Sequence, residues 1–275
     1  MRRPMSVRRT GGLKHGGKLA GLLVAAALGL LLCIPVGNWG GQGASAAYYY
    51  YNPGGTPLVL VLSPAAKTNP VGTSHTITAT VTQDGNPVEG VTVYFKVTGS
   101  VNTFGDCTTD AAGQCTFTYT GPTFPGADVI TAFADANGNG TRDADEPEAT
   151  ATKAWVLPTS TPGHVTGGGQ IVVAGHPVTF SLTAKSDSGG QKGECTVLDH
   201  ATSRMIKCLD VTALVQAGNE ATIYGDATDN GLPTTYVIHV VDNGDAGRGQ
   251  DTFSISTTSG FSASGTLTAG NIQVH

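Results

Sequence analysis

The sequence of 275 residues predicts an all-β fold, with an N-terminal β-sandwich followed by a second antiparallel β-sandwich or barrel-like domain. Three observations support this prediction. Charged residues make up only 13% of the chain, and 39 glycines supply turns. Apolar and polar residues alternate with a period of two in short runs, and Gly, Pro, Asp or Asn separates these runs. Such alternation is typical of strands with one buried face, so we expect many short strands joined by tight turns.

Seven strands are predicted in the first module, residues 57–156. In each run Val, Ile, Leu, Phe or Tyr alternates with Thr or another polar residue. Seven short strands within about a hundred residues, separated by turns such as Asp84-Gly85, are typical of an Ig-like sandwich. The predicted strands are 58–62, 75–82, 91–97, 101–107, 115–119, 128–134 and 149–156.

Residues 157–162 are interpreted as a linker, because Pro, Ser and Thr stiffen and solvate a chain, and residues 163–275 as a second β module. Gly167, Gly168 and Gly169 near its start are expected to form a β-turn, because no Lys-Ser or Lys-Thr follows them as in a phosphate loop. Strands are predicted at 177–184, 194–198, 205–211, 221–224, 234–241, 251–256 and 265–274.

Residues 1–46 have the features of a signal peptide. Four arginines and two lysines precede an apolar run at 19–36, and Ala44-Ser45-Ala46 forms a small-residue cleavage site. We expect cleavage after Ala46 and a secreted or cell-surface protein. The alternative is an uncleaved anchor, because about eighteen apolar residues can just span a bilayer. Residues 47–56, with four consecutive tyrosines, are expected to be a flexible segment.

The charge of the exported chain limits its partners. The leader carries six of the fifteen basic residues and none of the twenty acidic ones, so its removal leaves nine against twenty, a net charge of −11. Such a chain repels phosphate backbones, and nucleic acid is not expected as a partner. Membrane contact is expected only through an uncleaved leader, whereas a cation is a natural ligand.

Four cysteines follow the leader, and an even number indicates disulfides in an exported chain. Cys107 and Cys115 flank a predicted three-residue hairpin loop at 110–112. Cys195 and Cys208 flank a predicted six-residue loop at 199–204. Each pair would then lie directly across two strands, within disulfide range. The alternatives are a zinc site or a redox pair, but neither pair has C-x-x-C spacing.

Segment 135–146 has the ligand spacing of a calcium loop. Oxygen ligands stand at positions 1, 3, 5, 7, 9 and 12, and a glycine at position 6 allows the sharp turn. The flanking runs alternate with a period of two, so we expect the loop between two strands instead of the two helices of an EF-hand. The predicted Ca²⁺ ligands are Asp135, Asn137, Asn139, the backbone carbonyl of Thr141, Asp143 and Glu146.

The alternative for this segment is a solvated hairpin loop, because Asp, Asn and Gly also suit turns. Against it, the carboxylates of residues 135, 143, 145, 146 and 148 crowd together with only Arg142 among them. Without a cation these carboxylates would repel one another. We therefore expect calcium to act as a structural staple and not as a sensor that opens two helices.

Other polar patterns favour structural roles. Asp242, Asp245 and Asp251 would be candidates for a second cation, but their spacing fits no strict template and a solvated hairpin is favoured. The histidines after the leader stand singly, and no two have metal-ligand spacing. No nucleophile elbow or pair of opposed carboxylates is recognisable, so we do not expect an enzyme.

Two segments of the first module resemble the bacterial Ig-like domains of the invasin and intimin type. They are 83–93 (QDGNPVEGVTV) and 109–119 (TDAAGQCTFTY), and the resemblance covers about residues 57–156. It implies a sandwich scaffold of a kind that mostly forms repeated rods and is sometimes adhesive. This chain departs from the pattern by its single copy, its cysteine pair and its inserted calcium loop, so the resemblance implies the scaffold and leaves adhesion open. Segments 164–171 and 242–253 resemble a small β module at the ends of exported bacterial proteins.

The expected function is that of a non-catalytic exported structural or interaction module, stabilised by calcium. It would serve cell-surface or extracellular-matrix adhesion or spacing, with an extracellular protein or glycan as partner. The first alternative is a carbohydrate-binding or accessory module of a secreted polysaccharide-active system. That alternative requires an aromatic platform on one sheet face. For such a platform the second module supplies no tryptophan and only the aromatics Phe180, Tyr224, Tyr236, Phe253 and Phe261. The other alternative is a secreted hydrolase, with a cleft joining His and carboxylates.

Overall fold

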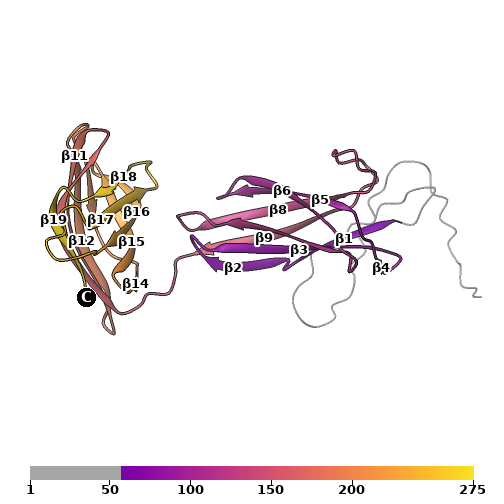
Figure 1. Cartoon of the computed structure of the whole chain (residues 1–275), viewed down its shortest axis with the longest axis horizontal. Helices are drawn as coiled ribbons and strands as arrows, with labels where there is room; N and C mark the ends of the chain where they lie inside the picture. Colours follow the sequence, from indigo (N-terminus) through magenta and orange to yellow (C-terminus); the bar gives the residue numbers. More distant parts are fainter. Residues whose placement is uncertain (1–56) are drawn as a thin grey trace, which may run out of the picture. The chain divides into compact units, whose positions relative to one another are not determined.

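The computed structural model describes residues 57–275, and the regular secondary structure there consists of β-strands (Figure 1). The predictions for residues 1–46 and 47–56 lie outside the described residues. Buried apolar side chains form two clusters, one within residues 60–155 and the other within residues 165–272. In residues 57–275 no helix is long and apolar enough to span a membrane. The all-β prediction is confirmed.

The first module is a sandwich of two sheets with the core between them. In one sheet β3 pairs with β1, β4 and β7, and the other sheet has the order β2-β9-β8-β5-β6. Core residues come from both sheets, as Ile77 and Val93 illustrate. The strands are β1 (Leu58–Ser63), β2 (Ala66–Pro70), β3 (Ser74–Gln83), β4 (Asn86–Pro87), β5 (Thr92–Gly99), β6 (Thr103–Thr108), β7 (Gln114–Thr120), β8 (Gly126–Asp135) and β9 (Glu148–Val156).

All seven predicted strands of this module are present, and two short ones were missed. The missed strand β2 pairs in parallel with β9, whereas β1 pairs antiparallel with β3. The chain therefore changes sheets between Ser63 and Ala66. Pro64 lies at this change and cannot donate a backbone hydrogen bond to continue the first ladder.

The second module is one strongly curled sheet, a half-barrel, so the barrel-like alternative describes it (Figure 1). Strands β10 to β18 pair mostly with their neighbours in sequence, and β13 and β14 both pair with β15. Strand β18 pairs with β17, and after a short bend β19 pairs with β10, which joins the two ends of the sheet. The strands are β10 (Gly163–Val173), β11 (His176–Asp187), β12 (Gly190–Asp199), β13 (Arg204–Cys208), β14 (Ala213–Ala217), β15 (Glu220–Asp229), β16 (Leu232–Val241), β17 (Thr252–Thr257), β18 (Ser262–Thr266) and β19 (Ala269–Val274).

The predicted β-turn at Gly167, Gly168 and Gly169 is wrong, because these residues lie in the middle of β10 and pair with both β11 and β19. The neighbouring strand approaches this stretch closely. A Cβ on Gly169 would collide with the carbonyl oxygen of Ala269, and one on Gly270 would collide with that of Gly168. The glycines therefore permit close strand contact and do not mark a turn.

Both predicted cysteine pairs are confirmed, with Cα–Cα distances of 5.8 Å for Cys107–Cys115 and 4.8 Å for Cys195–Cys208. The second pair bridges β12 and β13 as expected. The predicted hairpin around the first pair is wrong, because β6 pairs with β5 in one sheet and β7 with β3 in the other. This disulfide therefore crosslinks the two sheets of the sandwich.

Part of the predicted linker belongs to the second module. The hydroxyl of Ser160 accepts a hydrogen bond from the N–H of Leu214 at 3.1 Å. The N–H of Thr161 donates to the carbonyl of Leu214 at 2.9 Å. These bonds fasten the end of segment 157–162 along β14, so residues 160 and 161 continue the second module and do not act as a free spacer.

Candidate metal loop

The predicted calcium loop joins β8 to β9, two adjacent antiparallel strands of the five-stranded sheet. Asp135 ends β8, and Glu148 begins β9 opposite Phe133. Gly138 and Gly140 have φ of 74° and 73°, a backbone conformation that glycine adopts without strain. The expectation of a loop between strands, and not between helices, is therefore met.

The first and last predicted ligands, Asp135 and Glu146, fold the loop around their carboxylates. Asp135 Oδ1 accepts hydrogen bonds from the N–H groups of Gly138 at 2.7 Å and Asn139 at 3.2 Å, and its Oδ2 accepts one from Gly140 at 2.7 Å. The Glu146 carboxylate accepts from the N–H groups of Ala136 at 2.9 Å and Asp143 at 3.0 Å. Both acids are buried, with exposed fractions of 4% and 1%.

Hydrogen bonding keeps Asp135 ionised. Burial acts to raise the pKa of its carboxyl group, but the N–H groups of Gly140, Gly138 and Asn139 outweigh burial, and the pKa lies below its usual range. The carboxyl group of Glu146 adjoins that of Asp135 and contributes to the same lowering. An ionised, buried carboxylate beside a second acid is a favourable place for a hard cation.

The middle ligands gather around Asp143. The side-chain amides of Asn137 and Asn139 both lie 2.7 Å from Asp143 Oδ2, and the N–H of Thr141 donates to Asn139 Oδ1 at 2.7 Å. The predicted ligands thus form two groups, Asp135 with Glu146 and Asp143 with the two asparagines. Within residues 57–275 no group of three or more His, Cys, Asp or Glu side chains is arranged so that it could hold a metal ion.

The chemical types of the predicted ligands nevertheless suit calcium. These ligands are three carboxylates, two side-chain amides and one backbone carbonyl, and oxygen is the ligand that calcium prefers. The amides of Asn137 and Asn139 would turn their oxygens inward to bind an ion, because an amide carries an acceptor as well as a donor. Binding would also require the two ligand groups to close on one centre.

The second acidic run is used by the backbone. Asp251 is fully buried, and its carboxylate accepts from the N–H groups of Asn243 at 3.0 Å and Ile272 at 2.9 Å. The Asp242 carboxylate accepts from the N–H of Val274 at 3.1 Å, while Asp245 is exposed. The contacts with Ile272 and Val274 tie loop 242–251 to β19, which is a structural role for Asp251 and Asp242.

A buried polar cluster in the first module was missed at the sequence level. Asp128 Oδ2 accepts from the hydroxyl of Tyr119 at 3.2 Å and from Trp155 Nε1 at 2.6 Å. His75 meets Tyr119 edge to face, with ring centroids 5.7 Å apart. The Lys153 Nζ lies 4.0 Å from the centroid of the Trp155 ring. The sequence did contain a signal for this cluster, because Asp128 and Lys153 occupy positions that the period-two alternation assigns to the core-facing side of their strands.

Burial changes the titration of this cluster. It lowers the pKa of His75 to about 4, with further lowering by the charges of Lys153 and Lys67. It lowers the pKa of Lys153 to about 8. Burial and the neighbouring Asp128 raise the pKa of Tyr119. His75 is therefore neutral in the folded protein near pH 7, and its buried Nε2 has no hydrogen-bond partner within residues 57–275.

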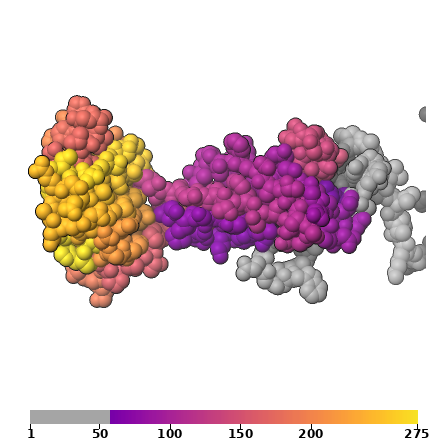
Figure 2. All heavy atoms as spheres, viewed as in Figure 1, coloured from indigo at the N-terminus to yellow at the C-terminus, as the bar shows by residue number. Residues whose placement is uncertain are grey.

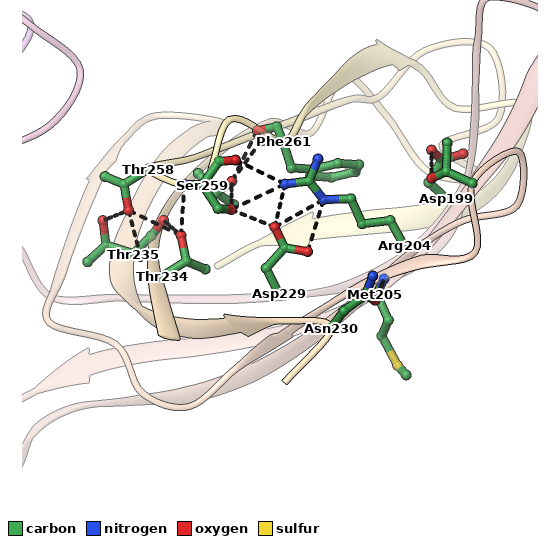
Figure 3. Close-up of polar contacts among 12 residues, drawn as sticks. Asp199, Arg204, Met205, Asp229, Asn230, Thr234, Thr235, Thr258, Ser259 and Phe261 are labelled. Atoms are coloured by element: carbon green, nitrogen blue, oxygen red, sulfur yellow. Dashed lines mark hydrogen bonds and ion pairs between the residues drawn. The ribbon is translucent and has the colours of Figure 1, made fainter. Parts of the chain in front are cut away.

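A second missed network lies at one end of the half-barrel, where Arg204, Asp229 and Ser259 meet (Figure 3). Arg204 Nε donates to Asp229 Oδ1 at 2.9 Å, and Ser259 Oγ donates to Asp229 Oδ2 at 2.6 Å. The guanidinium carbon of Arg204 lies 5.3 Å from the centroid of the Phe261 ring. Hydrogen bonds from Arg204 hold the pKa of Asp229 below its usual range, so this carboxylate is a poor base for activating Ser259.

The aromatic residues considered for a carbohydrate platform in the second module mostly belong to its core. Phe180 and Phe253 stack with centroids 3.9 Å apart, and Tyr236 and Phe261 are also buried. Tyr224 is half-buried. These five side chains therefore do not form an exposed platform.

No family model, curated protein or solved structure matches the chain. The resemblance of residues 83–93 and 109–119 to Ig-like domains of the invasin and intimin type stays a prediction.

Proposed function

We propose that this protein is an exported, non-catalytic structural and interaction module whose first sandwich is stabilised by calcium at residues 135–146. The pair of adjoining buried carboxylates, Asp135 and Glu146, supports the proposal most directly, with exposed fractions of 4% and 1%. Five backbone N–H groups donate hydrogen bonds to these carboxylates, and a bound cation would neutralise the negative charge that remains buried there. Arg142, the base within the loop, pairs instead with Glu148, with Nε and Oε2 2.9 Å apart.

The ion would be held by side-chain oxygens of Asp135, Asn137, Asn139, Asp143 and Glu146 and by the carbonyl of Thr141. When bound, Ca²⁺ supplies positive charge to this acidic loop and no redox or acid–base chemistry. The loop connects two paired strands, so binding stabilises a connection and does not open a pair of helices. Present at tenfold its dissociation constant, an ion bound only by the folded state adds about 1.4 kcal/mol to the free energy of unfolding.

Export and interaction are supported by the crosslinks and the charge. Two disulfides suit an oxidising compartment outside the cytoplasm. A net charge of −11 after removal of the leader favours cations and neutral partners over nucleic acid. The partner is proposed to be an extracellular protein or glycan at a cell surface or in a matrix.

Thermal unfolding in calcium and in a chelator tests the metal. We expect the midpoint of the wild-type protein to rise by about 5 °C in saturating Ca²⁺, because about 1 kcal/mol shifts a domain of this size by that order. Asp135→Asn should lose this difference between the two conditions. Asp145→Asn is the matched control, because Asp145 is an exposed acid of the same loop outside the ligand set. Equal midpoints for the wild type in calcium and chelator would contradict the proposal.

A further inference from the structure

The outward face of the five-stranded sheet carries a strip of three aromatic rings, Phe104 of β6, Tyr94 of β5 and Phe133 of β8. Tyr94 and Phe133 are direct cross-strand partners, and their rings stack with centroids 5.2 Å apart and an interplanar angle of 21°. Phe104 lies opposite Lys96, which is two residues from Tyr94 and therefore on the same face. We call these three residues the aromatic strip.

The aromatic strip is not part of the core. The other face of β5 supplies the core residues Val93, Phe95 and Val97. Phe104 is 85% exposed, the highest fraction among the exposed large apolar side chains of residues 57–275. Tyr94 and Phe133 are half-buried on the same outward face, and neighbouring aromatic rings on the outward face of a sheet indicate an interaction surface.

Polar groups stand between and beside the rings. Lys96 lies directly opposite Phe104 on one side and Thr131 on the other, and Asp106 lies directly opposite Tyr94. The surface thus alternates aromatic faces with hydrogen-bond donors and acceptors. A sugar polymer has the complementary chemistry, with C–H faces for the rings and hydroxyl groups for the polar side chains.

We propose that the aromatic strip binds a neutral polysaccharide, which gives the interaction module of the proposed function a class of partner. The net charge of −11 disfavours polyanions such as nucleic acid and acidic lipid surfaces but does not affect a neutral sugar chain. A protein partner fits less well, because the centres of protein interfaces are depleted of charged residues, whereas Lys96 and Asp106 are direct cross-strand neighbours of Phe104 and Tyr94.

The aromatic strip adjoins the metal loop. A Cβ added at Gly140 would lie 3.5 Å from the Tyr94 hydroxyl, so this hydroxyl borders the loop. Glu148 lies directly opposite Phe133 and binds Arg142 of the loop. Because one end of the strip is built against the loop, ordering the loop with calcium should strengthen glycan binding, and glycan should strengthen calcium binding equally.

Binding of the full exported chain to polysaccharides tests the proposal. The probes are insoluble cellulose and chitin in sedimentation assays and soluble xylan, laminarin and mannan in affinity electrophoresis, each with calcium or chelator. We expect binding to at least one probe, weakened about tenfold by Phe104→Ser or by Tyr94→Ser because a stacking ring is lost. Val172→Ser is the matched control, because Val172 is an exposed apolar residue of the second module, with 45% exposure.

Two results would overturn the proposal: no binding to any of these probes, or binding that Phe104→Ser and Tyr94→Ser leave unchanged. Self-association that Phe104→Ser abolishes, in the absence of glycan binding, would identify the strip as a protein contact instead. The calcium dependence of the melting midpoint is measured separately. If calcium raises the melting midpoint but no glycan binds, the proposal of glycan binding by the aromatic strip is refuted and the proposal of calcium binding by the loop still stands.

Discussion

Polar residues at core positions have the largest individual consequences for stability in the first module. Asp128 and Lys153 are directly opposite each other on β8 and β9, and both point into the core. Asp128 is satisfied by three donors, including the N–H of Val101 at 2.8 Å. Lys153 has the carbonyl of Ala154 at 3.0 Å and the Trp155 ring. Among the described residues His75 Nε2 has no hydrogen-bond partner, so His75 contributes volume and ring contact there and no hydrogen bond from that nitrogen.

The stability of the first module should fall as the pH falls from about 6.5 to about 4. Burial lowers the pKa of His75 to about 4 in the folded chain, whereas the pKa of an unburied histidine is 6.5. The unfolded chain therefore takes up a proton in this window that the folded chain does not, which favours unfolding as the pH decreases. At 1.36 kcal/mol per pKa unit the loss reaches at most about 3 kcal/mol.

Replacement by His75→Phe tests this dependence, because phenylalanine keeps the ring against Tyr119 and cannot titrate. Chemical denaturation at several pH values should show a shallower loss of unfolding free energy between pH 6.5 and 4 for the variant. His176→Phe is a control, because His176 is exposed. Parallel curves for the wild type and His75→Phe would show that His75 does not cause the acid sensitivity.

At the scale of elements, one end of the half-barrel is held by side chains between its turns. Arg204 begins β13, Asp229 ends β15, and Ser259 lies in the turn between β17 and β18 (Figure 3). Arg204 also donates to the carbonyl of Ser259 at 3.1 Å. Thr234 and Thr258 join the same network through their hydroxyls, 3.1 Å apart. Three connections that are distant in sequence are thereby fastened to one another.

Removal of the guanidinium should destabilise the second module. Arg204→Ala leaves the buried carboxylate of Asp229 without its charge partner, and we expect a loss of about 2 kcal/mol, below the value for a fully buried pair because Arg204 is partly exposed. Lys207→Ala is the control, since Lys207 is an exposed base of the same strand. Denaturant titration measures both. The double variant Arg204→Met, Asp229→Leu removes both charges. If it loses as much free energy of unfolding as Arg204→Ala alone, the unpaired charge of Asp229 is not the cause.

At the scale of the whole molecule, the chain has two hydrophobic clusters within separate stretches of sequence. Figure 2 shows the outer atoms of both stretches, coloured by residue number. The first lies between two sheets and is crosslinked across them by Cys107–Cys115. The second lies inside a single curled sheet whose ends are joined through β18 and β19. Each cluster therefore has its own topology and its own crosslink, which favours separate unfolding transitions.

Calorimetry should resolve these transitions with one variant in each module. Lys153→Met should raise one midpoint at pH 7, because burial lowers the pKa of Lys153 from 10.5 to about 8 and its charged form is disfavoured in the folded state. The gain should shrink as the pH rises above about 8, where folded Lys153 is already neutral. Arg204→Ala should lower the other midpoint alone. If both variants instead shift the midpoint of one common transition, the two modules unfold as one cooperative unit.

The amino-acid sequence alone determined the all-β class, the seven predicted strands of the first module, the cysteine pairs and the position of the acidic loop, while short or glycine-rich strands such as β2 and β10 were missed. Period-two alternation, cysteine separation and ligand spacing are local patterns, and each predicted strand of the first module was found. Even the missed polar cluster left a local trace in Asp128 and Lys153, which interrupt apolar faces. The chemistry of segment 135–146 was likewise visible, because its oxygen-bearing residues are consecutive in the loop.

Only the tertiary structure decided which strands became neighbours. It placed β6 and β7 in different sheets, set Gly167, Gly168 and Gly169 inside a ladder, and brought Arg204 to Asp229 and Ser259. It also placed Phe104, Tyr94 and Phe133 on the outward face of one sheet. The physical reason is that strand pairing depends on burying both faces of a sandwich or closing a curled sheet, and those energies come from contacts between segments far apart in sequence.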